Sequence, residues 1–151
     1  MTRASPSATA VVAAYASRGA ECAYANVKLM GRVVGSLYDE MFRVAGLRAN
    51  QVALMWAIAA LEPVDLGQLG EKTFTDQTTL SRTVENLRRA RLVTVRPGKD
   101  RRQKLVRLTP SGQRAFARAM PHWEEAQRRT AEILPLGDLR GLARQVRRRA
   151  A

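Results

Sequence analysis

Basic side chains crowd into one fifth of the sequence, from Gln77 to Arg107. This segment has ten basic and two acidic residues, so it carries +8 of the formal net charge of +13. A field of this sign attracts polyanions before any detailed contact forms. A solvated surface would have the same composition, but this density favours nucleic acid as the partner. The basic members are Arg82, Arg88, Arg89, Arg91, Arg96, Lys99, Arg101, Arg102, Lys104 and Arg107.

Two short helices are predicted to hold the first half of this cluster. The pattern predicts a helix over 65–72, capped by Asp65, and a second over 76–91, capped by Thr75 or Asp76. About three residues separate them, which is the spacing of a helix-turn-helix. One face of the second helix is apolar and carries Leu80, Val84 and Leu87.

A β-hairpin is predicted after the second helix. The period of the pattern changes from 3.6 to 2 over 93–96 and again over 104–108, with a turn at Pro97-Gly98 between the two runs. A buried helix is predicted upstream, from Asn50 to Leu61, because its apolar residues go nearly all round. This order of elements predicts a winged helix-turn-helix DNA-binding lobe.

The exposed side of the second helix is predicted to contact DNA. In helix-turn-helix proteins the first residues of this helix enter the major groove. Arg82 has the geometry to bond guanine, and Gln77 to bond adenine. The candidates for base contact are Gln77, Thr78, Thr79, Ser81 and Arg82, and those for phosphate contact are Arg88, Arg89 and Arg91.

The tip of the hairpin is the second predicted DNA contact. Lys99, Asp100, Arg101 and Arg102 are too polar to pack in a core. The narrow minor groove of A·T-rich DNA attracts arginine, so Arg102 is predicted to enter it. We expect Asp100 to orient Arg102 through a charge-assisted hydrogen bond and not to contact DNA.

Long helices are predicted on both sides of the lobe. One helical pattern runs over 9–44 with a break near Gly19, and another over 110–134, kinked or interrupted at Pro121. A basic terminal helix follows, and the first seven residues are predicted to be a disordered lead. The sequence thus predicts a mostly α fold with a small β-hairpin wing.

The pattern resembles the MarR family of bacterial winged-helix regulators over about 37–132. It departs from the family at Arg48, where a Thr or Ser cap is usual, and at Gly67 and Gly70. Each glycine weakens helix propensity by roughly 1 kcal/mol. The resemblance is carried by Tyr38-Asp39, Gly46-Leu47, Gln51, Thr79-Leu80-Ser81-Arg82, Arg91-Leu92-Val93, Asp100-Arg101-Arg102, and Leu108-Thr109 with Gly112.

The resemblance implies a homodimer that binds a palindromic operator, usually as a repressor. It implies one domain over 8–151, in which helices within 8–46 and 110–151 join the two copies and 50–109 forms the winged helix-turn-helix. Such regulators often leave DNA when a small ligand binds between the two regions, and we expect an aromatic or phenolic one. Its candidate contacts, which are equally typical of plain core, are Met30, Tyr38, Met55 and Trp56.

Cys22 is the single cysteine of the chain. Some members of the family sense peroxides through a cysteine in the first long helix. An ungapped alignment on Tyr38-Asp39 puts that position near Ala20, about 200° around the helix from Cys22. A buried, inert thiol is therefore the favoured expectation, and redox sensing is the alternative.

Other functional classes find less support in the sequence. With one Cys and one His, His122, the chain offers no disulfide framework and no ordinary zinc site, so we expect neither metal nor cofactor. No nucleophile has a His nearby and no Gly-rich phosphate loop occurs, which argues against an enzyme. The Ala-rich run at 8–16 is a poor secretory signal and the apolar run at 52–61 is too short to span a bilayer, so we expect a cytoplasmic protein without a membrane partner. Two alternatives remain, an architectural or RNA-binding protein and attachment to a membrane surface through the basic tail at 140–149.

Overall fold

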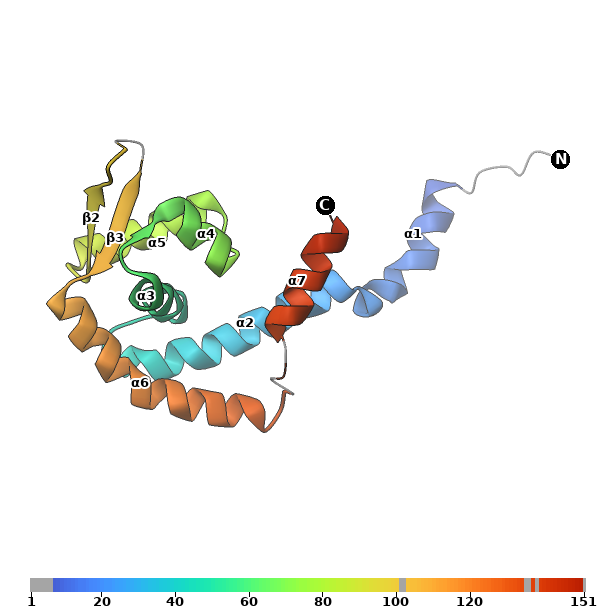
Figure 1. Cartoon of the computed structure of the whole chain (residues 1–151). Coiled ribbons are helices and arrows are strands. Elements are labelled where there is room, and N and C mark those ends of the chain that lie inside the picture. Colours follow the sequence, from blue (N-terminus) through green and yellow to red (C-terminus); the bar gives the residue numbers. More distant parts are fainter. Residues whose placement is uncertain (1–6, 101–102, 135–136, 138, 151) are drawn as a thin grey trace. The chain divides into compact units, whose positions relative to one another are not determined.

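The computed structural model shows a mostly helical chain with a small antiparallel sheet (Figure 1). It divides into two compact units, Met1–Ser36 and Leu37–Ala151. The predicted mostly α fold with a β-hairpin is confirmed. The structure describes residues 7–100, 103–134, 137 and 139–150.

The first unit is a broken helical segment. Ser7 begins its first helix, because the Ser7 Oγ accepts a hydrogen bond of 3.3 Å from the Ala10 amide. The predicted break near Gly19 is confirmed and takes the form of a 3-10 helix. Residues 1–6, which belong to the predicted disordered lead, lie outside the described residues. The elements of this unit are α1 (Ala8–Ala16), η1 (Ser17–Glu21) and the beginning of α2 (Ala23–Phe42).

The second unit contains the predicted helix-turn-helix and hairpin. α5 ends at Arg89, somewhat before the predicted end near Arg91. α6 continues through Pro121 as one helix, so no interruption occurs there. After α2 come η2 (Arg43–Ala45), α3 (Ala49–Leu61), β1 (Val64–Asp65), α4 (Leu66–Thr73), α5 (Gln77–Arg89), β2 (Val93–Pro97), β3 (Lys104–Leu108), α6 (Pro110–Ala131) and α7 (Leu139–Ala150).

The core of the second unit joins the apolar faces of α3, α5 and α6 to the sheet. The predicted apolar face of α5 is confirmed, because Leu80 and Leu87 are fully buried and Val84 nearly so. Burial of a side chain of this size stabilises the fold by about 1.5–3 kcal/mol. This face fixes the rotation of α5 and leaves its polar side exposed. The largest fully buried side chains are Phe42, Val52, Met55, Ile58, Val64, Leu69, Leu80, Leu87 and Val106.

β1 is a third strand that the sequence did not reveal. The sheet has the antiparallel order β1-β3-β2. β2 and β3 form the predicted hairpin, in which Val95 pairs with Val106, and on its other side Val106 pairs with Val64 of β1. Because β1 has only two residues, it leaves no alternating pattern in the sequence.

Two glycines permit close contacts between elements. A Cβ on Gly112 would lie 2.0 Å from the carbonyl oxygen of Leu92, so glycine is required where α6 begins. The Gly112 amide also donates to the Oγ1 of Thr109, the cap of α6, over 2.9 Å. A Cβ on Gly70 would lie 3.3 Å from Leu80 Cδ2, so this departure from the family brings α4 close to α5.

Arg48 begins α3 without a capping hydroxyl group. The Asp39 Oδ1 accepts a hydrogen bond of 2.6 Å from the Ala49 amide, and the Asp39 Oδ2 lies 3.7 Å from the Arg48 guanidinium. The Gln51 Oε1 accepts a second bond, of 2.9 Å, from the Arg48 amide. A carboxylate from α2 thus replaces the usual Thr or Ser cap. Such a cap stabilises a helix by about 1 kcal/mol.

Candidate nucleic-acid interface

The first turns of α5 present polar side chains to solvent. Asp76 caps this helix, because its Oδ1 accepts a hydrogen bond of 2.9 Å from the Thr79 amide. Hydrogen bonds from Thr79 hold the pKa of Asp76 below its ordinary value. The predicted base-contact residues are all exposed, and their contact with bases stays a prediction. They are Gln77, Thr78, Thr79, Ser81 and Arg82.

Arg88 and Arg89, predicted to contact phosphate, are both paired with Glu85. Arg88 donates from Nε to Glu85 Oε2 over 2.7 Å and from Nη2 to Oε1 over 2.8 Å. Arg89 donates from Nε to Glu85 Oε1 over 2.9 Å. These hydrogen bonds lower the pKa of Glu85 to about 2, so the carboxylate is ionised at neutral pH. We call Glu85, Arg88 and Arg89 the α5 cluster.

Arg91 does not lie on α5, although the sequence suggested that it would. The helix ends at Arg89, and Arg91 has a left-handed backbone with φ of 59°. Its amide donates to the Arg88 carbonyl over 2.9 Å, and its carbonyl accepts from Thr109 Oγ1 over 2.7 Å. Arg91 is exposed, but it belongs to the turn that joins α5 to β2.

The wing turn is closed by backbone hydrogen bonds. The Gly98 amide donates to the Gln103 carbonyl, and the Gln103 amide to the Asp100 carbonyl, each over 2.9 Å. Lys99 and Asp100 are exposed at the tip. The predicted minor-groove arginines 101 and 102, and the predicted pairing of Asp100 with the second of them, lie outside the described residues.

Two carboxylates tie the base of the wing to the segment before α4. The Asp65 Oδ1 accepts from the Gly67 amide over 2.8 Å and caps α4, while its Oδ2 accepts from the Lys104 amide over 3.2 Å. The Glu62 Oε2 accepts from the Leu108 amide over 3.0 Å. Lys104 and Leu108 are the end residues of β3, and β1 is too short to pair with either. Asp65 thus holds both the helix-turn-helix and the wing.

A groove of about 370 Å³ separates α5 from the wing. Arg88 and Glu85 line its helix side, and Arg96 and Lys104 line its wing side. Three cations and one anion therefore share this groove. A phosphate backbone that passes between a recognition helix and its wing would meet such a surface.

The predicted ligand contacts are each placed by the structure. Met55 is fully buried in the core, and Met30 lies exposed on α2 within the first unit. Tyr38 is half-buried, donates a short hydrogen bond to Gln127 Oε1 and packs edge-on against the ring of Phe42. Trp56 packs against two rings of α6, those of Phe116 and Trp123, with centroids 5.6 and 5.0 Å away. A pocket shared by the four stays a prediction.

Cys22 is exposed where η1 meets α2, so the expected buried thiol is not observed. In the part of the chain that the structure describes, His, Cys, Asp and Glu form no group able to hold a metal ion. No single helix among the described residues is long and apolar enough to cross a membrane, and only the bent pair 23–45 and 49–61 passes that test together.

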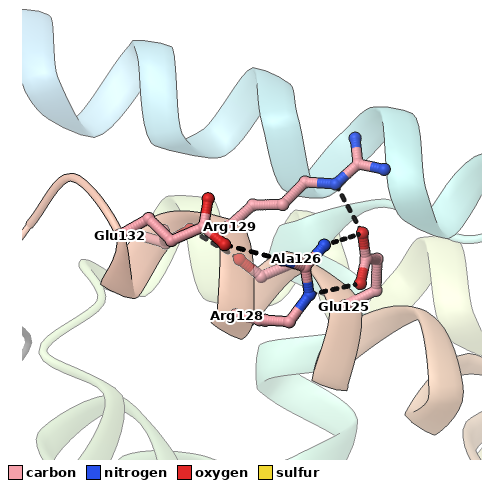
Figure 2. A network of polar contacts seen from close by, with 6 residues as sticks. Glu125, Ala126, Arg128, Arg129 and Glu132 are labelled. Carbon is pink, nitrogen blue, oxygen red and sulfur yellow. Dashed lines mark hydrogen bonds and ion pairs between the residues drawn. The ribbon is translucent and has the colours of Figure 1, made fainter.

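A second charged cluster lies near the C-terminal end of α6 (Figure 2). Glu125 accepts two hydrogen bonds from Arg128, of 3.0 and 2.8 Å, and one of 2.6 Å from Arg129. Arg128 also donates to Glu132 over 2.6 Å. The hydrogen bonds lower the pKa of Glu125 to about 2. We call these four residues the α6 cluster.

Comparisons with known proteins agree with the winged-helix architecture. A family model described as a winged helix DNA-binding domain matches residues 47–112. The transcriptional regulator MosR of M. tuberculosis, solved in complex with DNA, is 29% identical, with 84% of this chain and 92% of that chain covered and a TM-score of 0.72. AbsC of Streptomyces coelicolor, a MarR family regulator, shares the fold at 22% identity, with 86% and 90% covered and a TM-score of 0.68. MarR of E. coli shares it at 16% identity, with 84% and 96% covered and a TM-score of 0.64. The chain is a winged-helix regulator with the MarR-family fold. A search of curated proteins found no match.

Three side chains of this winged-helix regulator were missed as positioning groups. The pairing of Glu85 with Arg88 and Arg89 could have been inferred, because residues three and four apart are neighbours on a helix. The contacts of Asp65 and Glu62 with β3 left no such signal, since they join residues 39 and 46 positions apart.

Proposed function

We propose that this regulator binds a palindromic operator as a homodimer and represses transcription until a small ligand releases it. One observation carries the DNA contact. A single winged-helix lobe presents the exposed polar side of α5 and the basic wing on both sides of one groove. This is the arrangement with which a winged helix engages one duplex. Because a bacterial operator lies in the cytoplasm, the proposed function implies that the regulator acts there.

The proposed contacts divide by role along α5 and the wing. Residues 77–82 enter the major groove, where Arg82 bonds guanine and Gln77 bonds adenine. The α5 cluster lies further along the helix, where phosphates are nearer. The wing tip, 99–102, reaches the minor groove. Arg91 contacts phosphate from the turn after α5.

Apolar side chains on the terminal helices support the homodimer. Each of these helices exposes several large apolar side chains in the single copy, and exposed apolar surface marks protein interfaces. The mass of the protein in solution, measured by light scattering, should be twice that of one chain, and a monomer that binds the operator equally well would contradict a dimeric regulator. The exposed large apolar residues of α1, α2 and α7 are Val11, Val12, Tyr15, Tyr24, Val27, Leu29, Met30, Val33, Leu139, Leu142 and Val146.

Release by a small aromatic acid is supported by proteins of the same fold. A structure of BpsR of Bordetella bronchiseptica concerns regulation of its DNA binding by 6-hydroxynicotinic acid, and PcaV of Streptomyces coelicolor was solved with its natural ligand. In this chain, Tyr38 and Trp56 offer aromatic surface near α6. A screen of aromatic and phenolic acids should find one that dissociates the operator complex. If none of these acids dissociates the operator complex, the proposed release by such a ligand is wrong.

Selection of bound sites from random DNA tests the central proposal. We expect a palindromic site that outcompetes bulk DNA by roughly a thousandfold or more. An architectural protein would give no consensus and would bind both DNAs alike. The matched control is Arg129→Ala on α6, which removes one charge outside the proposed interface and should leave the selected site unchanged.

A redox-responsive regulator is a second candidate, favoured by the exposure of Cys22. Operator affinity with and without peroxide, in the natural protein and in Cys22→Ser, distinguishes the two. A peroxide effect that disappears in the variant supports redox control. Equal affinity of the natural protein under both conditions excludes it.

A further inference from the structure

Glu85 is the only acidic residue of α5, and it lies within the surface proposed to bind DNA. An acid there repels phosphate, so its presence calls for a physical reason. Asp76 is the helix cap and is accounted for by its hydrogen bond to Thr79. Glu85 caps no helix and contacts Arg88 and Arg89 instead.

The geometry leaves both guanidinium groups able to bind a second anion. A guanidinium has five N–H donors in a fixed plane. Arg88 directs its Nε and Nη2 to Glu85, and Arg89 directs its Nε. The N–H groups of Nη1 on Arg88, and both terminal nitrogens of Arg89, are not used in these bonds. Glu85 therefore orients the two side chains without saturating them.

The surroundings give this carboxylate an electrostatic effect on binding. Glu85 faces the groove in which Arg88, Arg96 and Lys104 also lie. Nonspecific affinity for DNA grows with the number of phosphates that a protein neutralises and the counterions that it releases. A carboxylate within 3 Å of two arginines reduces that number for any DNA that approaches loosely.

We propose that Glu85 is a specificity-determining residue, which weakens binding to arbitrary DNA and orients Arg88 and Arg89 for the phosphates of the operator. In the operator complex, base contacts by residues 77–82 fix α5 in the groove. Phosphates then meet the outward N–H groups of two arginines that are already in place. On arbitrary DNA nothing fixes the helix, and the negative charge of Glu85 opposes the approach. The inference rests on the proposed function. The low pKa of Glu85 keeps its carboxylate charged at the pH of the cell.

The α6 cluster supplies a matched control within the same chain. Glu85 and Glu125 each pair with arginines three and four residues later. The variants Glu85→Gln and Glu125→Gln each replace that carboxylate by a neutral amide. Each variant raises the net charge by one. The two substitutions make the same chemical change on different surfaces, and the α6 cluster keeps a second acid, Glu132, beside Arg128. Both acids are half-buried, and thermal unfolding and solution mass check that each variant folds and associates normally.

The experiment measures affinity for the selected operator and for bulk DNA over a range of salt concentrations. For Glu85→Gln we expect affinity for bulk DNA to rise about three- to tenfold, with a salt dependence steeper by about one unit of slope. Operator affinity should change by less than about twofold, because lost orientation offsets the lost repulsion. The preference for the operator then falls by about three- to tenfold. Glu125→Gln should leave each quantity within about twofold of the original.

Two results would overturn the inference. One is an equal change in both variants, which would assign the effect to net charge alone. The other is an unchanged preference for the operator in Glu85→Gln. Failure of the proposed function has a different signature, because the unsubstituted protein would then show no preference for any site over bulk DNA.

Discussion

The α5 and α6 clusters are built from the same five-residue pattern, an acid followed by two arginines three and four positions later. Glu85 with Arg88 and Arg89 makes hydrogen bonds of 2.7 to 2.9 Å, and Glu125 with Arg128 and Arg129 makes bonds of 2.6 to 3.0 Å. Both acids have a pKa lowered to about 2 by those bonds. Local sequence is enough to specify this geometry, since helical neighbours need no tertiary contact.

The clusters differ in what surrounds them. On α6, Glu132 adds a second acid through its bond to Arg128, so charges balance within the cluster (Figure 2). On α5 the excess positive charge is retained and the wing adds Arg96 and Lys104 across the groove. The same motif is thus a neutral surface in one place and part of a cationic groove in the other. What such a cluster can bind therefore depends on the neighbouring elements and not on the motif itself.

The largest expected effect separates the two arginine pairs. Replacing both Arg88 and Arg89 by Ala should lower operator affinity by about a hundredfold at moderate salt and reduce the salt slope by about two, because two phosphate contacts are lost. Replacing both Arg128 and Arg129 by Ala removes the same charge and should change affinity by less than about threefold. Fluorescence anisotropy with labelled operator at several salt concentrations measures both. Equal losses in the two double variants would show that the two arginine pairs do not differ in DNA binding.

A smaller effect distinguishes base contact from phosphate contact within α5. Replacing Arg82 by Ala should cost about tenfold in operator affinity and relax base preference, with little change in salt slope. Replacing Arg88 alone by Ala should lower the slope by about one and keep the base preference. Sites selected from random DNA by each variant show which occurred. A lower salt slope with an unchanged base preference in Arg82→Ala would show that Arg82 contacts phosphate and not a base.

The helix-turn-helix and the hairpin could be predicted because their signals are local. Alternation over 93–96 and the apolar face of α5 both depend on neighbours within a few residues, and both are confirmed. The caps Asp65 and Asp76 are confirmed for the same reason. Arg91 was placed on the helix because no local signal marked its left-handed backbone.

Apart from the pairing of Glu85 with Arg88 and Arg89, the interactions that were missed join different elements of the chain. Asp39 begins α3 from another helix, and Glu62 and Asp65 bond the ends of β3. A pattern of residue types cannot reveal these contacts, because it does not show which backbone amide of another element lies near a given carboxylate. The burial of Cys22 was expected because that residue lies about 200° around the helix from the sensing position of the family. In the structure Cys22 is exposed.

The next expected effect concerns the wing, which lies across the groove from the α5 cluster. Among the described residues, the α6 cluster has no such neighbour in that groove. In Asp65→Asn the Oδ1 cap of α4 can remain, but an NH₂ group cannot accept from the Lys104 amide. Loss of one such bond is worth about 1 kcal/mol, so amide exchange at Lys104 should accelerate about fivefold and operator affinity fall about two- to fivefold. Asp76→Asn, a cap without a bond to the wing, should leave Lys104 exchange unchanged. Slow exchange in Asp65→Asn would show that the wing is held by other contacts.

The smallest expected effect is on acid stability, and here the two clusters should agree. The pKa values of Glu85 and Glu125 fall from 4.5 to about 2 on folding, because arginines donate hydrogen bonds to both carboxylates. A carboxyl with a lowered pKa stabilises the folded state above its unfolded pKa and ceases to do so as the pH falls through its folded pKa. The contribution should therefore fade between pH 4.5 and about pH 2 in each cluster. Because the arginines of both clusters are exposed and the two acids only half-buried, we expect Glu85→Gln and Glu125→Gln to lower Tm only slightly near neutral pH. The deficit should shrink over this acid range. Thermal scans at a series of pH values measure the deficit. Equal deficits would mean that the clusters stabilise alike and differ only in binding, whereas a pH-dependent deficit in one variant alone would show that their local energetics differ as well.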